Sequence, residues 1–492
     1  MIKRKKDFVL VTIIYLFSSF IRLSINYSTE FIPGSNGAFY LSNVRSILET
    51  GEIIFKDFPL IFWLEALLSK LFFVLGIAEF EKSIDLACRL FDSFIPPLAI
   101  LPAYLLIKRL LVNSEKEYYA VLFASLSTLF ISFMILVSDF QKNSLGLLWL
   151  FSLMLWVYKS LEEKKLINYS ISFLFLSLTG ITHFGCFLVA VLYIIVVLLV
   201  KKLVHRKIEL KNVLIAGLLL IVAYVIIYLI SPPRLKTVFD FLFNMFRNST
   251  ILLLLKGKPL ISPIDLVNQI LINLTSIIAV IFYIKNYKML SDTHRIFILS
   301  SVVLSLILAS PFIGIEWSQR LGFISYIPAV MLIPFIFNNV KTEIARKLIL
   351  TITLTIVLLS VTVRVKIPTF SNMNYKIYAE LQTSKEKLPK DGNVLLVSRH
   401  GLEWWVSYIL RKPVVRESAL EKIYWDRFKY MLFIIQKKDK PPFGPLGIFG
   451  PPFREPVLPN GAEQLFSGIY FDIYWSKIPP QDMSIFIEPI SY

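Results

Sequence analysis

The fold is decided by the stretch Phe184-Gly-Cys-Phe-Leu-Val-Ala-Val-Leu-Tyr-Ile-Ile-Val-Val-Leu-Leu-Val200, which Lys201-Lys-Leu-Val-His-Arg-Lys207 follows directly. An unbroken apolar run that ends in a cluster of cations is typical of a helix that crosses a membrane. The pattern recurs along the chain and predicts about eleven spans. They are Phe8–Ile25, Leu90–Ile107, Tyr119–Val137, Leu145–Val157, Ile167–Ile181, Phe184–Val200, Val213–Ile230, Leu260–Ile284, Ile296–Ile313, Leu321–Phe337 and Leu348–Val363.

Every second connection between these spans is short and rich in Lys and Arg. Because positive charge beside a membrane helix favours the cytoplasmic side, these connections and the N-terminus are predicted to face inward. The other connections then face outward, and they carry most of the residues suited to chemistry. The basic connections are Lys3–Lys6, Lys108–Lys116, Lys159–Lys165, Lys201–Lys211, Lys285–Arg295 and Lys341–Lys347.

The composition also indicates a membrane protein. Of the 492 residues, 56% are hydrophobic and 14% aromatic, and the mean hydropathy is +0.67, which no ordinary soluble domain reaches. The net charge of +18 does not indicate nucleic-acid binding, because many of the cations lie in the inward connections, where topology and anionic lipid account for them. We therefore expect a multi-pass protein of the cell membrane, with membrane lipid and no nucleic acid among its partners.

Two parts of the chain lie outside the alternation of spans. The first outer loop, residues 26–89, contains the apolar stretch Phe58–Ala78. We expect this stretch to dip into the membrane without a net crossing, because a crossing would invert every later basic connection. From Lys366 onward the apolar runs shrink to strand length. The sequence thus predicts an α-helical polytopic membrane domain over residues 1–365 and a small extracytoplasmic α/β domain over residues 366–492.

The tail contains a series of short elements separated by polar residues. Strand candidates rich in β-branched and aromatic residues alternate there with one short amphipathic helix. A stretch dense in Pro and Gly, Pro441–Pro459, is predicted to be a loop. The expected strands are Asn393–Ser398, Lys412–Arg416, Tyr430–Gln436 and Gly468–Trp475, and the expected helix is Leu402–Leu410.

The first outer loop carries two candidate bases, Glu30 and Asp57. Group transfer needs a base that takes a proton from the acceptor, and a carboxylate is suited to this. Between them, Asn36 and Tyr40 lie in a turn with aromatic residues. The alternative is that both carboxylates are solvated loop residues and that Pro59 merely begins a helix.

A second polar patch, Ser138–Asn143, lies at another outward connection. Asp139 is a candidate ligand for a divalent cation such as Mg²⁺ or Mn²⁺, and Lys142 is suited to pairing with a lipid phosphate. The alternative is structural, since Ser138 or Asp139 can cap the helix that follows.

Three further outward positions are candidates for substrate binding. His183 lies in a turn between two spans, where the alternative role is a hydrogen bond within the packing. Arg320 suits a phosphate but can equally pair with Glu316 on the same helix. In the tail, Trp404 and Trp405 offer an aromatic platform for a sugar or peptide, or anchor the domain at the membrane interface.

These motifs together resemble the GT-C class of polytopic membrane glycosyltransferases. Pro33–Tyr40 is similar to the first-loop motif of that class, Asp57–Leu60 to the helix start that follows it, and Ser138–Asn143 to its second acidic motif. Glu403-Trp404-Trp405 resembles the Trp-Trp-Asp signature of oligosaccharyltransferases. The resemblance implies transfer of a sugar from a polyprenyl-phosphate carrier to a glycan, lipid or protein acceptor on the outer face of a prokaryotic, archaeal-type envelope.

The resemblance also implies roles for the candidate residues. Asp57 or Glu30 would activate the acceptor, Asp139 would orient a metal ion or the acceptor, and Arg320 would neutralise the departing phosphate. The remaining expected substrate contacts are Asn36, Tyr40, Lys142, His183, Trp404 and Trp405.

The sequence departs from the class pattern at two positions. Asn36 stands where the first-loop motif has its acid, and an amide cannot act as a base. Val406 follows the Trp pair in place of Asp, so transfer of an oligosaccharide to asparagine is not supported. Two alternatives therefore stay open, a non-catalytic protein that binds or translocates a polyprenyl-linked glycan and an ion-coupled transporter. The spans contain few charges for an ion path, which disfavours the transporter.

Overall fold

The computed structural model describes residues 2–111, 117–205, 210–230, 233–244, 263–389, 393–440 and 455–477, together with residues 246, 249, 251 and 255. The chain forms two compact units. The helical unit comprises Met1–Arg22, Lys56–Ile61 and Phe91–Ile367, and the sheet unit comprises Leu23–Phe55, Phe62–Leu90 and Pro368–Tyr492.

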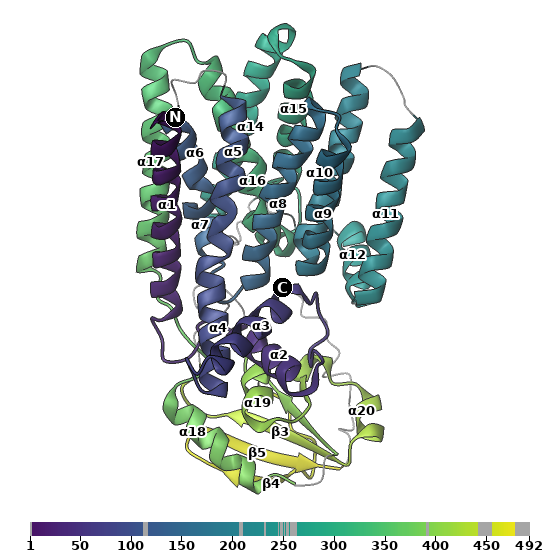
Figure 1. Cartoon of the computed structure of the whole chain (residues 1–492). Helices are drawn as coiled ribbons and strands as arrows, with labels where there is room; N and C mark the ends of the chain where they lie inside the picture. The colour runs from purple at the N-terminus through teal and green to yellow at the C-terminus, as the bar shows by residue number, and fades with distance from the viewer. Residues whose placement is uncertain are drawn as a thin grey trace. The chain divides into compact units, whose positions relative to one another are not determined.

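The helical unit is a set of helices that run side by side (Figure 1). Every predicted span contains a helix, because each apolar run is long enough to satisfy its backbone hydrogen bonds internally. Seven helices of the described residues are long and apolar enough to cross a membrane, as expected of a multi-pass membrane protein. The helices are α1 (Ile2–Asn26), α5 (Ile100–Leu110), α6 (Glu117–Leu129), α7 (Ile131–Met134), α8 (Gln141–Glu162), α9 (Leu166–Thr182), α10 (Phe184–His205), α11 (Leu210–Ile230), α12 (Pro233–Asn244), α14 (Pro263–Asn286), α15 (Asp292–Leu308), α16 (Ile315–Asn339) and α17 (Glu343–Lys366).

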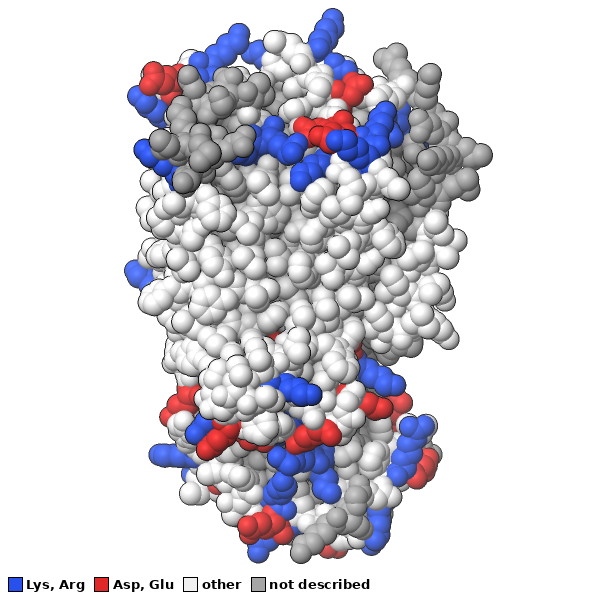
Figure 2. All heavy atoms as spheres, viewed as in Figure 1, with Lys and Arg blue, Asp and Glu red and all other residues white. Residues whose placement is uncertain are grey.

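The basic connections of the sequence lie together at one end of the helical unit. Figure 2 shows Lys and Arg gathered at the end where the N-terminus lies, next to a band of uncharged residues. Side-chain contacts join residues in or beside these basic connections to one another there. They link Lys108 with Asp7, Arg109 with Glu162, Thr293 with Leu161, His205 with Asp292 and Asn338 with Leu110. The alternation of basic and other connections is therefore a property of the fold.

The apolar stretch in the first outer loop forms one short helix, α3 (Leu60–Val74). With 15 residues it is about 22 Å long, less than the hydrocarbon thickness of a bilayer. Gly76, at φ +68°, allows the chain to turn after it into α4 (Phe80–Phe94). Trp63, Leu67 and Val74 on α3 are exposed. A helix of this length fits the prediction of a segment that enters the membrane without a net crossing.

The sheet unit contains a five-stranded sheet of order β2-β1-β3-β5-β4. Strands β2, β1 and β3 run parallel to one another. Strand β5 is antiparallel to β3, and β4 is antiparallel to β5. Four strands and α19 coincide with predicted elements, while β4, α18 and α20 are additional. The elements are α18 (Tyr375–Ser384), β1 (Val394–Ser398), α19 (Glu403–Leu410), β2 (Val414–Arg416), α20 (Lys422–Arg427), β3 (Tyr430–Gln436), β4 (Glu463–Ser467) and β5 (Phe471–Ser476). The predicted loop lies outside the described residues over 441–454.

Most of the first outer loop belongs to the sheet unit. It contains the helix α2 (Gly37–Thr50), which packs on α19 through Ser42 Oγ, a donor to the carbonyl of Trp404 at 3.0 Å. The Arg45 guanidinium lies 3.5 Å from the ring centroid of Tyr408 and donates to its carbonyl. Gly34 also pairs with Ser371 as an isolated parallel bridge. The two segments, far apart in sequence, thus share one core.

Candidate functional site

The turn before α8 has an unusual backbone. Ser138 has φ +69°, in the left-handed region that few residues other than glycine adopt. Its N–H donates to Oδ2 of Asp92 at 2.9 Å. Phe140 occupies the N-cap position of α8, and its side chain makes no capping hydrogen bond. Ser138 and Asp139 therefore precede the N-cap position of α8.

Asp92 is held in turn by Arg22, a residue of α1. The Arg22 guanidinium donates to Asp92 Oδ1 at 2.5 Å and to the Asp92 carbonyl at 2.8 Å. It also donates to Ser144 Oγ at 3.1 Å, on the first turns of α8. Both charged side chains have no exposed surface. The pair thus contacts Ser138, just before Asp139, and Ser144, further along the chain, and so fixes the turn that contains Asp139.

Lys142 and Asp57 form an ion pair within the helical unit. The Lys142 ammonium donates to Asp57 Oδ2, and the two side chains are only 10% and 12% exposed. Asp57 Oδ1 accepts the backbone N–H of Phe58 at 2.8 Å. The fold therefore brings together a candidate base and a candidate phosphate ligand that are 85 residues apart in sequence.

His183 lies close to the same end of α8. Its Nδ1 accepts the backbone N–H of Cys186 at 3.2 Å, so the imidazole closes the first turn of α10. Helices α8 and α10 approach closely because Gly146 has no side chain, and a Cβ there would lie 2.7 Å from Cys186 Sγ. The Phe184 ring lies 6.1 Å from that of Phe58, next to Asp57.

Arg320 lies on the second turn of α16. Its side chain is exposed, and its guanidinium carbon is 5.6 Å from the centroid of the Trp317 ring. Phe323, one turn further on, lies 5.6 Å from Phe140, which follows Asp139. The start of α16 thus reaches the turn before α8. The side chain of Glu316, the alternative partner of Arg320, lies outside the described residues.

Sequence reasoning missed three buried polar residues beside this turn, Arg22, Asp92 and Gln141. Both amide atoms of Gln141 are buried, and within the described part of the chain they have no hydrogen-bond partner. A buried amide of this kind is costly unless another group satisfies it. A charge inside each of the first two predicted spans was the available signal for Arg22 and Asp92.

Glu30, the second candidate base, belongs to the sheet unit. Its side chain is exposed, and Oε2 accepts the backbone N–H of Tyr375 at 3.1 Å. Tyr375 is the first residue of α18, and Asn374 caps the same helix through Ile377 N–H at 2.9 Å. A carboxylate at a helix N-terminus is favoured by the helix dipole. Glu30 therefore has a structural contact of its own.

The remaining first-loop candidates lie at the start of α2. Asn36 occupies its N-cap position without a side-chain capping bond and is half-buried. Tyr40 is 2% exposed, and its ring lies 6.0 Å from that of Phe62. Tyr40 therefore packs in the interior of the sheet unit, whereas Asn36 retains some surface.

The two tryptophans of the tail differ in exposure. Trp404 is half-buried, with its ring 4.9 Å from that of Phe39 and 4.6 Å from that of Phe55. Trp405 has no exposed surface and lies 5.4 Å from the ring of Phe31. Trp405 therefore serves the packing of the sheet unit, and the surface available to a ligand belongs to Trp404.

The residues around Asp139 fit a metal ion poorly. In the described ranges no three His, Cys, Asp or Glu side chains come together in a way that would hold one. Gln141 and Lys142 follow Asp139, and Asp57 is bound by the Lys142 ammonium. A divalent cation brought to Asp57 would have to displace that ammonium against charge repulsion. Among the described residues, Asp139 therefore lacks the further carboxylate or imidazole ligands that the predicted cation site would need.

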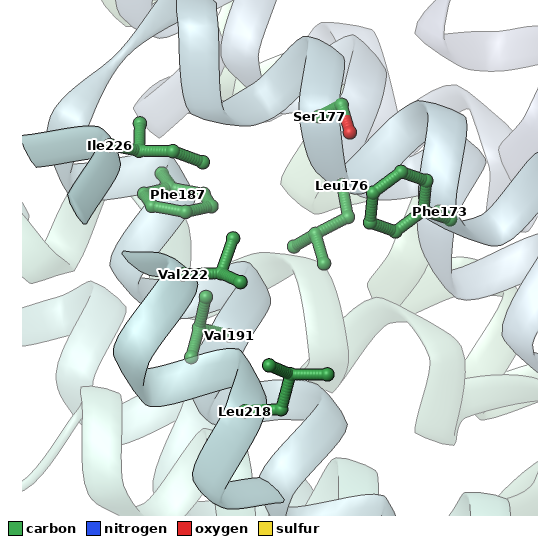
Figure 3. Close-up of a pocket in the computed structure, with 8 residues that line it drawn as sticks. All are labelled: Phe173, Leu176, Ser177, Phe187, Val191, Leu218, Val222 and Ile226. Carbon is green, nitrogen blue, oxygen red and sulfur yellow. The ribbon is translucent and has the colours of Figure 1, made fainter. Parts of the chain in front are cut away.

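An apolar pocket of about 240 Å³ lies elsewhere in the helical unit, between α9, α10 and α11. Figure 3 shows its lining, in which Ser177 is the single polar side chain among those drawn. Such a lining suits a hydrocarbon chain and offers nothing to a charged group. The lining residues are Phe173, Leu176, Ser177, Phe187, Val191, Leu218, Val222 and Ile226.

Comparison with known proteins identifies the fold. No family model matches the chain, and no curated protein sequence matches it. An oligosaccharyltransferase from Archaeoglobus fulgidus in its apo form is similar in structure, with a TM-score of 0.56 at 11% identity over 86% of this chain and 69% of that one. The same enzyme, AglB, with an inhibitory peptide and a dolichol-phosphate gives 0.54 at 11% identity over 86% and 69%. Its complex with Zn and sulfate gives 0.51 at 11% identity over 85% and 67%. The chain therefore has the GT-C fold, and the predicted resemblance is confirmed.

Proposed function

We propose that this chain is a membrane glycosyltransferase that moves a sugar from a polyprenyl-phosphate carrier to an acceptor of the cell envelope on the outer face. The observation that carries the proposal is the pair of Asp57 and Lys142, next to the Asp139 turn, in a GT-C fold. A carboxylate beside a cation supplies the two charges that glycosyl transfer from a phosphate needs. The dolichol-phosphate bound to AglB supports the class of carrier.

The reaction begins at the acceptor. Asp57 takes the proton of the acceptor hydroxyl or amide while the acceptor atom forms a bond to the anomeric carbon of the sugar. The bond between that carbon and the phosphate oxygen breaks, and the electron pair leaves with the phosphate. Arg320, exposed at the start of α16, would approach the phosphate and neutralise it as it departs.

Asp57 is the better of the two candidate bases. It is nearly buried and lies beside the Lys142 ammonium, in the helical unit that also contains Asp139. Glu30 is exposed and already accepts a backbone hydrogen bond at the start of α18. We therefore assign Asp57 to proton transfer and Glu30 to the stability of the sheet unit.

The other candidates take supporting roles in the proposal. Asp139 would orient the acceptor, and His183 would hold the first turn of α10 beside α8. Asn36 and Trp404 retain surface, and we propose them as substrate contacts within the sheet unit. Tyr40 and Trp405 are buried and would hold Asn36 and Trp404 in place, and Lys142 would contact the phosphate of the carrier.

The hydrocarbon part of the carrier needs an apolar environment. The pocket between α9, α10 and α11 is lined almost wholly by aliphatic and aromatic side chains (Figure 3). Burial of hydrocarbon there is favourable by about 25 cal/mol per Å² removed from water. We propose that this pocket receives part of the polyprenyl chain.

The proposal is tested by mass spectrometry of envelope glycans and lipid-linked sugars from a deletion strain. If wild type restores a missing sugar and Asp57→Asn does not, the transferase function holds and the sugar is identified. The conservative change keeps the size of the side chain, and the level of each protein in the membrane is measured alongside. Equal restoration by the variant would remove Asp57 from the role of base.

One observation favours a second function. Asn36 stands in place of the acid of the first-loop motif. This replacement suits a protein that binds or translocates a polyprenyl-linked glycan without catalysing a reaction. In that case the deletion strain would accumulate complete lipid-linked glycans and lose no sugar from them. The same mass spectra therefore separate the two functions.

A further inference from the structure

We infer that this chain binds the phosphate of its carrier without a metal ion, because Lys142 supplies the positive charge. The inference rests on the proposed function and names the group that recognises the substrate. It follows from the disagreement between the residues around Asp139 and a metal site. The cation that the structure places on a carboxylate here is the Lys142 ammonium, which pairs with Asp57.

The environment of Lys142 is that of a fixed charge. The ammonium is 10% exposed and bonded to Asp57, so it is held in one place near the end of α8. An ammonium is a compact cation with three N–H donors, which suits the oxygens of a phosphate. A lysine at the protein surface would be a mobile, hydrated charge and would make a weaker site.

The position of Lys142 on α8 adds a second favourable field. It is the second residue of a helix of 22 residues, so the first N–H groups of α8 lie at the same helix end. The N-terminus of a helix carries a partial positive charge and binds phosphate. The lysine and the helix end therefore favour an anion together, and both disfavour a divalent cation.

Transfer itself increases the negative charge on the phosphate. The sugar-linked carrier is a phosphodiester with one negative charge, and release of the sugar leaves a phosphate monoester that acquires a second. Lys142 therefore stabilises the departing group more than the bound donor, as an effective catalyst requires. No co-reactant is needed, because the proton released by the acceptor goes to Asp57.

The test measures binding, so it does not depend on turnover or on the identity of the sugar. Full-length protein in nanodiscs of neutral phosphatidylcholine is titrated with dolichyl phosphate and, separately, with dolichol, and the bound lipid is measured by native mass spectrometry. Each titration is run with EDTA and with added Mg²⁺ or Mn²⁺. The variants are Lys142→Met, Lys142→Arg, the double change Asp57→Asn with Lys142→Met, and Lys347→Met as a matched control on an exposed lysine.

We expect wild type to prefer dolichyl phosphate over dolichol equally with EDTA and with metal. Lys142→Met should weaken this binding about ten- to hundredfold, the usual worth of a hydrogen bond to a charged group. Lys142→Arg should retain most of it, and Lys347→Met should match wild type. Lys142→Met alone removes the ammonium that pairs with the nearly buried Asp57 carboxylate, and this could cause misfolding. The double variant also replaces that carboxylate by an amide, so the loss of binding expected in it cannot be attributed to an unpaired charge.

Two results would overturn the inference while leaving the proposed function intact. One is binding that disappears in EDTA and returns with Mg²⁺ or Mn²⁺, and the other is wild-type affinity in Lys142→Met. A wild-type protein that binds dolichyl phosphate no better than dolichol under every condition would instead overturn the proposed function itself. Inorganic phosphate as a competitor shows whether the site recognises the headgroup alone or only the headgroup on its lipid.

Discussion

Arg22 and Asp92 form an ion pair with no exposed surface, and the same Asp92 carboxylate accepts the backbone N–H of Ser138. One oxygen thus neutralises the arginine of α1 and the other holds the left-handed turn before α8. The position of Asp139 therefore depends on a residue in the first predicted span, more than a hundred residues away in sequence. The dependence of this turn on Asp92 and Arg22 can be tested by mutation.

Asp92→Ala should destabilise the helical unit by about 3–5 kcal/mol, because it leaves the buried Arg22 without its partner. The double variant Arg22→Met with Asp92→Leu should regain much of the thermal stability, since a buried ion pair is often replaceable by apolar residues. It should not regain activity, because nothing then holds the Ser138 N–H. Thermal unfolding in detergent and the envelope-glycan assay are measured on both variants. Restored activity in the double variant would contradict the role assigned to Asp92.

Ser138 allows a second test of the same turn. Ser138→Gly should be neutral or slightly stabilising, because glycine adopts φ +69° without steric cost. Ser138→Val should destabilise by about 1–3 kcal/mol, since a β-branched residue is strained there. Ser138→Ala serves as the reference for loss of the hydroxyl. Equal melting temperatures for the Gly and Val variants would show that the turn is not left-handed in solution.

Glu417 makes the stability of the sheet unit depend on pH. Burial, helped by nearby Glu403, raises the pKa of Glu417 from 4.5 to about 7, against the lowering effects of a backbone hydrogen bond, Arg416 and Arg399. The folded state therefore keeps a proton that the unfolded chain releases near its ordinary pKa. The stability that this proton contributes is fully present below about pH 4.5 and is lost as the pH rises to about 7.

We expect this loss to amount to about 2 kcal/mol, after allowance for the partial exposure of the carboxyl group. Glu417→Gln should remove the dependence and make the sheet unit more stable than wild type at pH 8. Tryptophan fluorescence is a suitable probe, because Trp63, Trp404, Trp405, Trp425 and Trp475 lie in that unit. Stability that rises between pH 5 and pH 7 in wild type, relative to the variant, would contradict the prediction.

The apolar pocket gives a test of the carrier's hydrocarbon chain. Val222→Trp should fill the space between α9, α10 and α11 and weaken the binding of dolichyl phosphate several-fold, because the lipid loses apolar surface to bury. Leu220→Trp is the matched control, since Leu220 is exposed on the same helix and does not line the pocket. Native mass spectrometry measures both affinities. Equal losses in the two variants would remove the pocket from the proposed lipid path.

The sequence predicted the elements of this protein well because each depends on local pattern. The apolar run Phe184–Val200 satisfies its own hydrogen bonds, so its helix follows from composition alone. The run Tyr430–Gln436 is a strand because it is short and apolar up to its last residue. The edge strand Glu463–Ser467 was missed because most of its side chains are exposed and no alternation marks it.

The contacts between residues of the candidate site could not be predicted from the sequence. Asp57 and Lys142 were each singled out, but their spacing of 85 residues says nothing about contact. Capping of α8 by Ser138 or Asp139 was one of two alternatives from the sequence, which could not show that Phe140 is at the N-cap position or that Ser138 donates its N–H to Asp92 from a left-handed turn. Likewise, the packing of α2 on α19 depends on side chains that no local pattern connects.

We propose that Asp57 is the base in glycosyl transfer from a polyprenyl-phosphate carrier. The most direct measurement incubates purified full-length protein in nanodiscs with a whole-membrane extract of the deletion strain, which supplies both the sugar-linked carrier and the acceptor, and follows lipid-linked sugars by mass spectrometry. Wild type and Glu30→Gln should convert one sugar-linked carrier into free polyprenyl phosphate, whereas Asp57→Asn should not. Conversion by Asp57→Asn at the wild-type rate, or no conversion by wild type, would contradict this proposal.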